Sequence, residues 1–408
     1  MVLSKSVTIE KKYKDTEFIE LIREVIAESI EINSFYKELV DKGGFRLDDL
    51  NTIDDLVTVP YVPTMFYKQS ADHYRRLLKI PDNSPQFDHW NVSSCTSGDP
   101  SLVGVNNDDV EFLSEMARKC FLEFIPRDWS RALISIFSPS ANMLNRLVMR
   151  YTKLRPVRSY AGNYYEVTNK MAKVKYLINF SLLRAIYAII VTRSLVGAFI
   201  INSKFVFKTF EENLRKPEEK RLYLATGGSN QLVKNFMALM KEKGISYNLG
   251  KSFDVVLGGG GWDGHKAQMK YDPIDKAQFV SDIVEAFGTE ESQVVDIYGF
   301  TESPIIFGSH WSKKYEDFVM HCPPYARILV RDINTLEPVK VGETGFLESL
   351  TPFGVNAMVS HAVLVDDLVE LISENKCPEC GYEGSTFRIL KRVTDKAGLG
   401  CSSMISWQ

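Results

Sequence analysis

Two short stretches of the sequence carry side chains that suit binding of a phosphate or a magnesium ion. The first is NVSSCTSGDP, from residue 91, which packs small hydroxyls around a glycine: Ser93, Ser94, Thr96, Ser97 and Gly98. Such a turn, between strands expected at 87–92 and 102–105, can hold an anion with hydroxyls and backbone N–H groups. No Gly-Lys-Ser/Thr opens a helix here, so it is not a Walker A loop. The alternative is an ordinary serine-rich surface turn.

The second stretch is DIYGFTES, residues 296–303, in which a Thr-Glu pair follows the end of an apolar strand. Ligands of α/β sheets bind at the carboxyl ends of the strands. Tyr298 suits stacking on a base, Thr301 suits a phosphate oxygen, and Glu302 suits Mg²⁺. The alternative is a plain strand end whose glutamate is solvated.

Four consecutive glycines lie in LGGGGWDGHK, residues 257–266, directly after another apolar strand. They allow close approach of the backbone to a flat or anionic ligand, or they simply make a tight turn. The spacing does not give the GxGxxG fingerprint of dinucleotide-binding proteins.

Two thiols at the spacing of a zinc site lie in CPEC, at Cys377 and Cys380. A tetrahedral zinc site needs two further ligands, and the candidates are His310, His321 and Cys322. A reduced cysteine-rich turn without metal is the alternative. Redox chemistry is less expected, because no thioredoxin-like pattern surrounds the pair.

Composition bounds what the chain can do. It has 408 residues and a net charge of −3, so its charge does not favour binding to nucleic acid or to an acidic membrane surface. Six cysteines at irregular spacing, without an export signal, indicate a reducing compartment, and we expect a cytoplasmic protein. The apolar run 176–203 is divided by Arg184 and Arg193, which excludes a membrane span. We expect a buried helix there that leads into a strand.

The pattern along the chain predicts an α/β protein. Helical periodicity covers residues 16–41 and 230–243. Compact apolar runs that end in or run into Gly, Ser or Thr predict parallel strands at 131–137, 221–226, 253–259 and 294–299. Short strands joined by turns predict an antiparallel part over 325–372. We expect four units: a helical segment packed on the main body (1–85), an α/β core (86–324), a small β subdomain with the CxxC pair (325–387) and a mobile tail (388–408).

The hydroxyl-rich loop, the glycine-rich strand end and Tyr-Gly-x-Thr-Glu occur in an order that resembles the adenylate-forming superfamily. The last third is most similar to the acyl-protein synthetases of the bacterial luminescence fatty-acid reductase complex. This resemblance rests on DIYGFTE, LVRDINTLEPVKVGETGFLESLTP, VLVDDLVEL and CPECGYEGSTFRILKRVTDKAGLGC, and it covers the chain from about residue 90. The phenylacetate–coenzyme A ligase branch shares much of it but carries a larger C-terminal domain. The resemblance implies the N-terminal adenylate-forming domain, with parallel α/β sheets, a small antiparallel β subdomain and a truncated C-terminal tail.

The resemblance implies that residues 93–98 hold the phosphates of ATP. It also implies that the adenine pocket is lined by Gly259, Gly260 and Gly261. The loop departs from the family pattern at two positions. Cys95 stands where relatives usually have a small residue or glycine, and Ser101 stands where many have lysine. Because both positions lie in or next to the loop expected to hold phosphate, we expect Cys95 and Ser101 to change the affinity of the loop for phosphate.

By the same resemblance, the residues that contact the adenylate are Tyr298, Gly299 and Thr301. Glu302 would bind Mg²⁺, Asp367 would take the ribose hydroxyls, and Arg392 would lie at the hinge. Lys391 departs from the pattern, since a glycine usually precedes the hinge arginine.

Cys401, in GLGC, matches the cysteine that carries the acyl group in this family. A thiolate is strongly nucleophilic at neutral pH, and Lys396 and Arg392 would favour it over the thiol. Gly398 and Gly400 would let this segment swing from the adenylate to a partner protein. The alternative is a partly buried, inert cysteine.

We therefore predict a ligase that uses ATP and Mg²⁺ to convert a carboxylic acid, by resemblance a fatty acid, into an acyl adenylate. The acyl group would pass to Cys401 and then to an acyl-acceptor protein such as a reductase. One alternative is an acyl- or aryl-coenzyme A ligase, in which a free thiol replaces Cys401. Another is a nucleotide-binding scaffold without catalytic activity.

Overall fold

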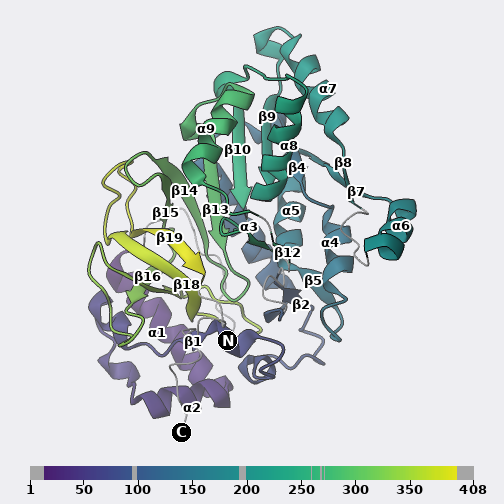
Figure 1. Cartoon of the computed structure of the whole chain (residues 1–408). Helices are drawn as coiled ribbons and strands as arrows, with labels where there is room; N and C mark the ends of the chain where they lie inside the picture. Colours follow the sequence, from purple (N-terminus) through teal and green to yellow (C-terminus); the bar gives the residue numbers. More distant parts are fainter. Residues whose placement is uncertain are drawn as a thin grey trace.

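The computed structural model describes residues 13–93, 99–192, 199–258, 260–266, 269–270 and 272–392 (Figure 1). The helical pattern at 16–41 forms two helices, α1 (Asp15–Ile32) and α2 (Ser34–Gly43). They separate at Asn33, whose side chain accepts a hydrogen bond from the Tyr36 N–H and caps α2. Gly44 ends α2 at φ 66°, the left-handed conformation that glycine adopts readily.

The parallel part of the fold is one side of a twelve-stranded sheet. Its strands, in spatial order, are β6 (Lys173–Tyr176), β4 (Ala132–Phe137), β9 (Tyr223–Gly228), β10 (Phe253–Gly258) and β13 (Val294–Gly299). All four predicted strands are present and pair in parallel. Their carboxyl ends therefore meet at one edge of the sheet, where ligands of α/β proteins bind.

The other side of the same sheet is antiparallel (Figure 1). Beyond β13 follow β14 (Ile306–Ser312), β15 (Asp317–His321), β19 (Thr386–Arg392), β18 (Ala362–Ser373), β17 (Thr344–Leu350) and β16 (Arg327–Arg331), and β1 (Val62–Pro63) pairs with β18. The expected α/β class with an antiparallel part is confirmed. Two details differ from the sequence prediction: the antiparallel pairing already begins at β14, and residues 388–392 belong to β19. The division of the chain into four units stays a prediction.

Three small sheets lie outside the large one. The first holds β3 (Leu102–Val105), β2 (His89–Val92) and β5 (Val157–Ser159), so a strand stands on each side of the hydroxyl-rich loop, as predicted. The others pair β7 (Ile178–Phe180) with β8 (Phe199–Ile201) and β11 (His265–Lys266) with β12 (Met269–Lys270).

The remaining helices are α3 (Asn107–Phe124), α4 (Ala141–Val148), α5 (Tyr160–Met171), α6 (Leu182–Thr192), α7 (Ser203–Leu214), α8 (Asn230–Glu242) and α9 (Lys276–Phe287). Several begin at capping side chains: Asn106 accepts from the Asp109 N–H, and Asp275 accepts from the Gln278 N–H. α3 packs against α5 and β14, and α8 packs against α9. Helices thus contact the large sheet at β14, through α3, and at β9, through α8.

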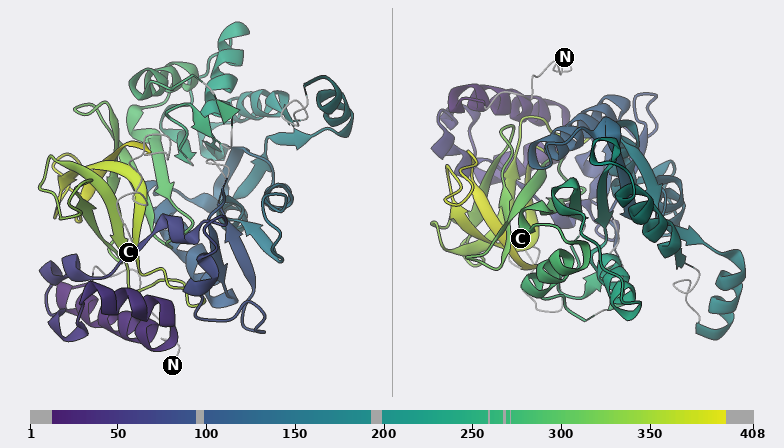
Figure 2. Two further views of the ribbon diagram at one scale, coloured as in Figure 1. Left: turned by 60° about the horizontal axis from the view of Figure 1, so that its bottom comes forward. Right: turned by 90° about the horizontal axis from the view of Figure 1, so that it is seen from above.

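The expectation of a buried helix within 176–203 is wrong. α6 projects from the body of the molecule in both views of Figure 2. Leu183, Tyr187 and Ile190 are 82%, 68% and 74% exposed. The apolar repeat predicts a helical face but does not say whether another element covers it. Among the described residues, none of the helices combines the length and apolarity needed to cross a bilayer.

A buried ion pair joins the antiparallel part to the N-terminal segment. Arg331, on β16, contacts the carboxylate of Glu348, which is fully buried on β17. The same guanidinium donates to the carbonyl of Val57 at 2.9 Å. We expect Arg331→Ala to lower the free energy of unfolding by about 3–5 kcal/mol, because it leaves a buried carboxylate without its partner.

Chemical denaturation followed by circular dichroism measures this difference. The matched control is Arg388→Ala, since Arg388 pairs with Glu370 at 2.7 Å where both side chains are partly exposed. We expect a loss of at most about 1 kcal/mol for the control. Equal losses in the two variants would contradict the assignment of Arg331 as a structural anchor.

Candidate active site

The centre of the candidate site lies where side chains from three strands meet. Tyr298, near the end of β13, donates a hydrogen bond from its hydroxyl to Asp367 Oδ2, on β18, at 2.6 Å. Across the β18–β19 pair, Asp367 stands opposite Arg392. Burial and the Asp367 carboxylate raise the pKa of Tyr298, so the phenol stays protonated and remains a donor. The structure thus brings three predicted residues together.

Charge at this centre is balanced mainly between Arg392 and carboxylates. Asp367 raises the pKa of Arg392 most strongly, and Glu302 raises it further, so the guanidinium is charged at neutral pH. Arg392 is exposed, whereas Glu302 is only 3% exposed.

The turn after β13 keeps the predicted Thr-Glu pair away from bulk water. Thr301, next to Glu302, is 6% exposed. The turn reverses the chain into β14, where the Ile306 N–H donates to Tyr325 Oη at 3.3 Å. Because β14 pairs with β13 directly after this turn, the position of the Thr-Glu pair is set by backbone pairing on both sides.

A second group of contacts joins this turn to the hydroxyl-rich loop. β2 and β5 are parallel neighbours, so Ser93 and Tyr160 follow adjacent strand ends. Tyr160 Oη lies 3.4 Å from the position that a Cβ would take on Gly299. The base of the loop is closed by the Ser93 N–H, which donates to the Ser101 carbonyl at 3.1 Å. The residues Ser94, Thr96, Ser97 and Gly98 lie outside the described part of the chain.

Glycines form the edge of the sheet beside the turn. Gly260 and Gly261 have φ values of 64° and 90°, a region that side-chain-bearing residues rarely adopt, and Gly259 is not among the described residues. Sequence reasoning missed a second pair at the end of β9. A Cβ on Gly227 would lie 2.5 Å from the carbonyl oxygen of Val256, so only glycine fits between β9 and β10. The Gly-Gly dipeptide after LAT was the available signal.

Three further side chains at the site come from regions to which the sequence analysis gave no role. Thr64 donates from its hydroxyl to Asp366 Oδ2 at 2.9 Å. Burial raises the pKa of Asp366, and the positive charge of Lys68 is among the effects that oppose it. Lys68 also forms a β-bridge with Ser101, at the far end of the hydroxyl-rich loop. The adjacent acids of VLVDDLVEL are a readable signal for Asp366, but nothing local marks Thr64 or Lys68.

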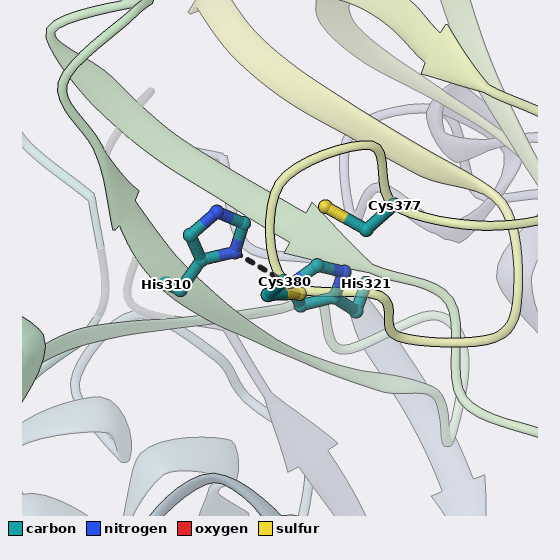
Figure 3. Close-up of side chains that lie close together, drawn as sticks. All are labelled: His310, His321, Cys377 and Cys380. Carbon is teal, nitrogen blue, oxygen red and sulfur yellow. Dashed lines mark hydrogen bonds between the residues drawn. The ribbon is translucent and has the colours of Figure 1, made fainter.

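A separate group of ligand-type side chains lies on the antiparallel part. Figure 3 shows His310 and His321 on neighbouring strands, with Cys377 and Cys380 beside them on a loop. One ligand atom from each lies within 4.8 Å of the others. Cys322, the fifth candidate, is not in this group: it is buried, and its Sγ lies 3.8 Å from the Pro323 carbonyl oxygen.

Comparison of the sequence with known families shows which family the chain belongs to. Residues 9–408 match the family described as Acyl-protein synthetase, LuxE. The chain belongs to this family. Similar curated proteins are the long-chain-fatty-acid–luciferin-component ligases of Aliivibrio fischeri, 24% identical over 87% of this chain and 79% of the relative, and of Vibrio harveyi, 22% identical over 92% and 83%. The predictions of family and of a ligase are confirmed.

Solved structures show the same fold. An open conformation of 2-hydroxyisobutyryl-CoA ligase, in complex with 2-HIB-AMP and CoA, has a TM-score of 0.62 at 15% identity and covers 93% of this chain and 70% of that chain. The thioesterification state of that ligase gives a TM-score of 0.63 at 16% identity, over 93% and 68%. The expected adenylate-forming fold is confirmed. Lys396 and Cys401 lie outside the described residues, so their roles stay predictions.

The Tyr298–Asp367 hydrogen bond offers a test of how this centre is held. Tyr298→Phe removes one donor from a carboxylate, so we expect the free energy of unfolding to fall by about 1.5–3 kcal/mol. The matched control is Tyr315→Phe, because the Tyr315 hydroxyl accepts a hydrogen bond from the exposed Lys314 side chain at 3.0 Å. We expect the control to change stability by less than about 0.5 kcal/mol. A Tyr298 variant as stable as the control would refute the assignment.

Proposed function

We propose that this chain activates a carboxylic acid with ATP and then transfers the acyl group through its own cysteine to an acceptor protein. One observation carries the proposal: the Tyr160 hydroxyl stands beside Gly299, so the end of β5, the parallel neighbour of the strand that leads into the hydroxyl-rich loop, lies against the end of β13, although the two strands belong to different sheets. The hydroxyl-rich loop and the Thr-Glu turn can then contact the same nucleotide. The curated relatives are named for long-chain fatty acids, and we carry that substrate class over.

In the first step an oxygen of the substrate carboxylate attacks the α-phosphorus of ATP. The bond from the α-phosphorus to the bridging oxygen breaks, pyrophosphate leaves, and an acyl adenylate remains. The chain's part is to hold the phosphates with the loop that starts at Ser93, the base beside Gly260 and Gly261, and the ribose at Asp367. Tyr298 fixes the orientation of Asp367 through its hydrogen bond at 2.6 Å.

The donor set also suits Mg²⁺. Glu302 is a buried carboxylate in the turn after β13, and carboxylate oxygens are the ligands that Mg²⁺ prefers. We assign Glu302 to hold the ion. Bound there, Mg²⁺ would neutralise charge on the phosphate oxygens.

In the second step the Cys401 thiolate attacks the acyl carbon, the bond from that carbon to the AMP oxygen breaks, and AMP leaves. An enzyme thioester results, and it splits one difficult transfer into two easier ones. Lys396 and Arg392 would favour the thiolate, whose proton goes to solvent. The acyl group then passes to the acceptor, for which a reductase is our proposal by resemblance.

Pyrophosphate exchange tests the first step without the second. Full-length protein is incubated with ATP, labelled pyrophosphate and a panel of fatty, aryl and small acids. Exchange that depends on a fatty acid supports the proposal. ATP binding without exchange across the panel would instead indicate a nucleotide-binding scaffold and overturn it.

Glu302→Gln probes the proposed magnesium ligand. We expect acid-dependent exchange to fall by about 10²–10³-fold, the scale on which loss of one group that stabilises transition-state charge lowers kcat. The matched control is Glu337→Gln, an exposed glutamate on the β16–β17 turn, and it should leave exchange unchanged. Equal rates in the two variants would contradict the role of Glu302.

Cys401→Ala separates the two steps. We expect this variant to keep pyrophosphate exchange and to lose the acyl label that mass spectrometry detects on the C-terminal peptide of wild-type protein. Ser402→Ala, at the next position, should keep both. A label that persists in Cys401→Ala, or turnover of that variant that requires coenzyme A, would overturn the cysteine route, and the latter would indicate a coenzyme A ligase.

A further inference from the structure

The four side chains of Figure 3 come from three separate pieces of the antiparallel part. His310 lies on β14 and His321 on β15, and the register sets them diagonally, since His310 stands opposite Val319. Cys377 and Cys380 lie on the connection between β18 and β19. The sheet itself therefore positions the two imidazoles, and the connection is folded back over them.

The spacing of the ligand atoms fits one tetrahedral ion. Zn–N bonds of about 2.0–2.1 Å and Zn–S bonds of about 2.3 Å place tetrahedral ligand atoms about 3.3–3.8 Å apart. Here His310 Nδ1 lies 2.8 Å from His321 Nε2, and Cys380 Sγ lies 3.6 Å from the same Nε2. The largest separation in the group is below 4.8 Å. Shifts of about 1 Å or less would bring all four atoms onto one ion.

The cysteine turn is built in a way that aims both thiols at the histidines. The Cys377 N–H donates to the Tyr382 carbonyl at 2.8 Å, and the Gly381 N–H donates to the Cys377 carbonyl at 3.1 Å. Gly381, at φ 76°, allows the tight reversal after the second cysteine. Both thiols are free rather than joined in a disulfide.

The surroundings also suit a closed structural site. The His321 ring stacks on Phe124 at 5.6 Å and lies 4.6 Å from the Tyr382 ring, so apolar groups limit access of water. His310 Nε2, the nitrogen that does not face His321, lies 3.6 Å from a Glu379 oxygen. A carboxylate behind a ligating histidine fixes its ring orientation in many zinc proteins. Two thiolates and two imidazoles without a carboxylate ligand select zinc over magnesium or calcium.

We propose that His310, His321, Cys377 and Cys380 bind one structural Zn²⁺ ion with four protein ligands and no open position. The ion ties the β18–β19 connection to β14 and β15, and it is independent of the acyl-transfer proposal. Its effect on the site is positional, because β18 carries Asp367 and β19 ends at Arg392.

Metal analysis of the full-length protein tests this inference. We expect one zinc per chain in protein purified without chelator, and a thiolate-to-cobalt charge-transfer band when Co²⁺ replaces zinc. Cys377→Ser and Cys380→Ser should lose the metal and the band. The matched control is Cys322→Ser, because Cys322 is buried nearby but faces Pro323. It should keep both.

Thermal unfolding supplies a second readout that does not depend on the variants folding well. Wild-type protein treated with a strong chelator should unfold at a lower temperature, and Zn²⁺ but not Mg²⁺ should restore it, since a ligand that binds only the folded state stabilises it. Wild-type protein that stays metal-free after incubation with Zn²⁺, or equal metal loss in Cys322→Ser and Cys380→Ser, would overturn the assignment.

Discussion

The rest of the site depends on the pairing of β13, which is parallel to β10 on one side and antiparallel to β14 on the other. The chain must therefore reverse directly after Gly299, at the edge where the parallel strands end. That reversal holds Thr301 and Glu302 in a buried turn and starts the antiparallel part, whose later strands return with Asp367 and Arg392. One change of strand direction thus brings Tyr298 together with Asp367 and Arg392, which lie up to almost a hundred positions further along the chain.

This geometry gathers carboxylates close together, and the proposed chemistry must offset their repulsion of the phosphates of ATP. The charge of Arg392 acts on the carboxylates of Glu302, Asp366 and Asp367, and the charge of Lys68 acts on Asp366. Adding the phosphates of ATP to such a group is unfavourable where burial strengthens repulsion. A divalent cation between carboxylates and phosphates converts that repulsion into attraction. Among the described residues of this group the acids outnumber the bases, which would suit a magnesium–nucleotide complex better than free ATP.

The sequence predicts the strands well because each is a compact apolar run that ends in small residues, and the turns that carry the candidate site residues follow directly. It could not predict partners that meet only through long-range pairing. Thr64 contacts Asp366 across 302 positions, and Tyr160 lies against Gly299 although their strands belong to different sheets. The exposure of α6 could not be predicted for a related reason. The sequence repeat shows that the helix has an apolar face, but whether another element packs on that face depends on the whole fold. In the same way the CxxC pair was readable, but the choice of both histidines over Cys322 needed the register of β14 and β15.

The anchoring of β19 also limits where the proposed acyl carrier can go. Cys401 follows Arg392 by nine residues, and a fully extended stretch of that length spans at most about 30 Å. The thiol can therefore reach the adenylate only if Arg392 is held near it. Arg392 is placed by pairing with Asp367 and, twelve residues earlier in the chain, by Cys380 at the proposed zinc site. A metal far from the reacting atoms would then act on the transfer step through geometry alone, by fixing the point from which the carrier segment departs.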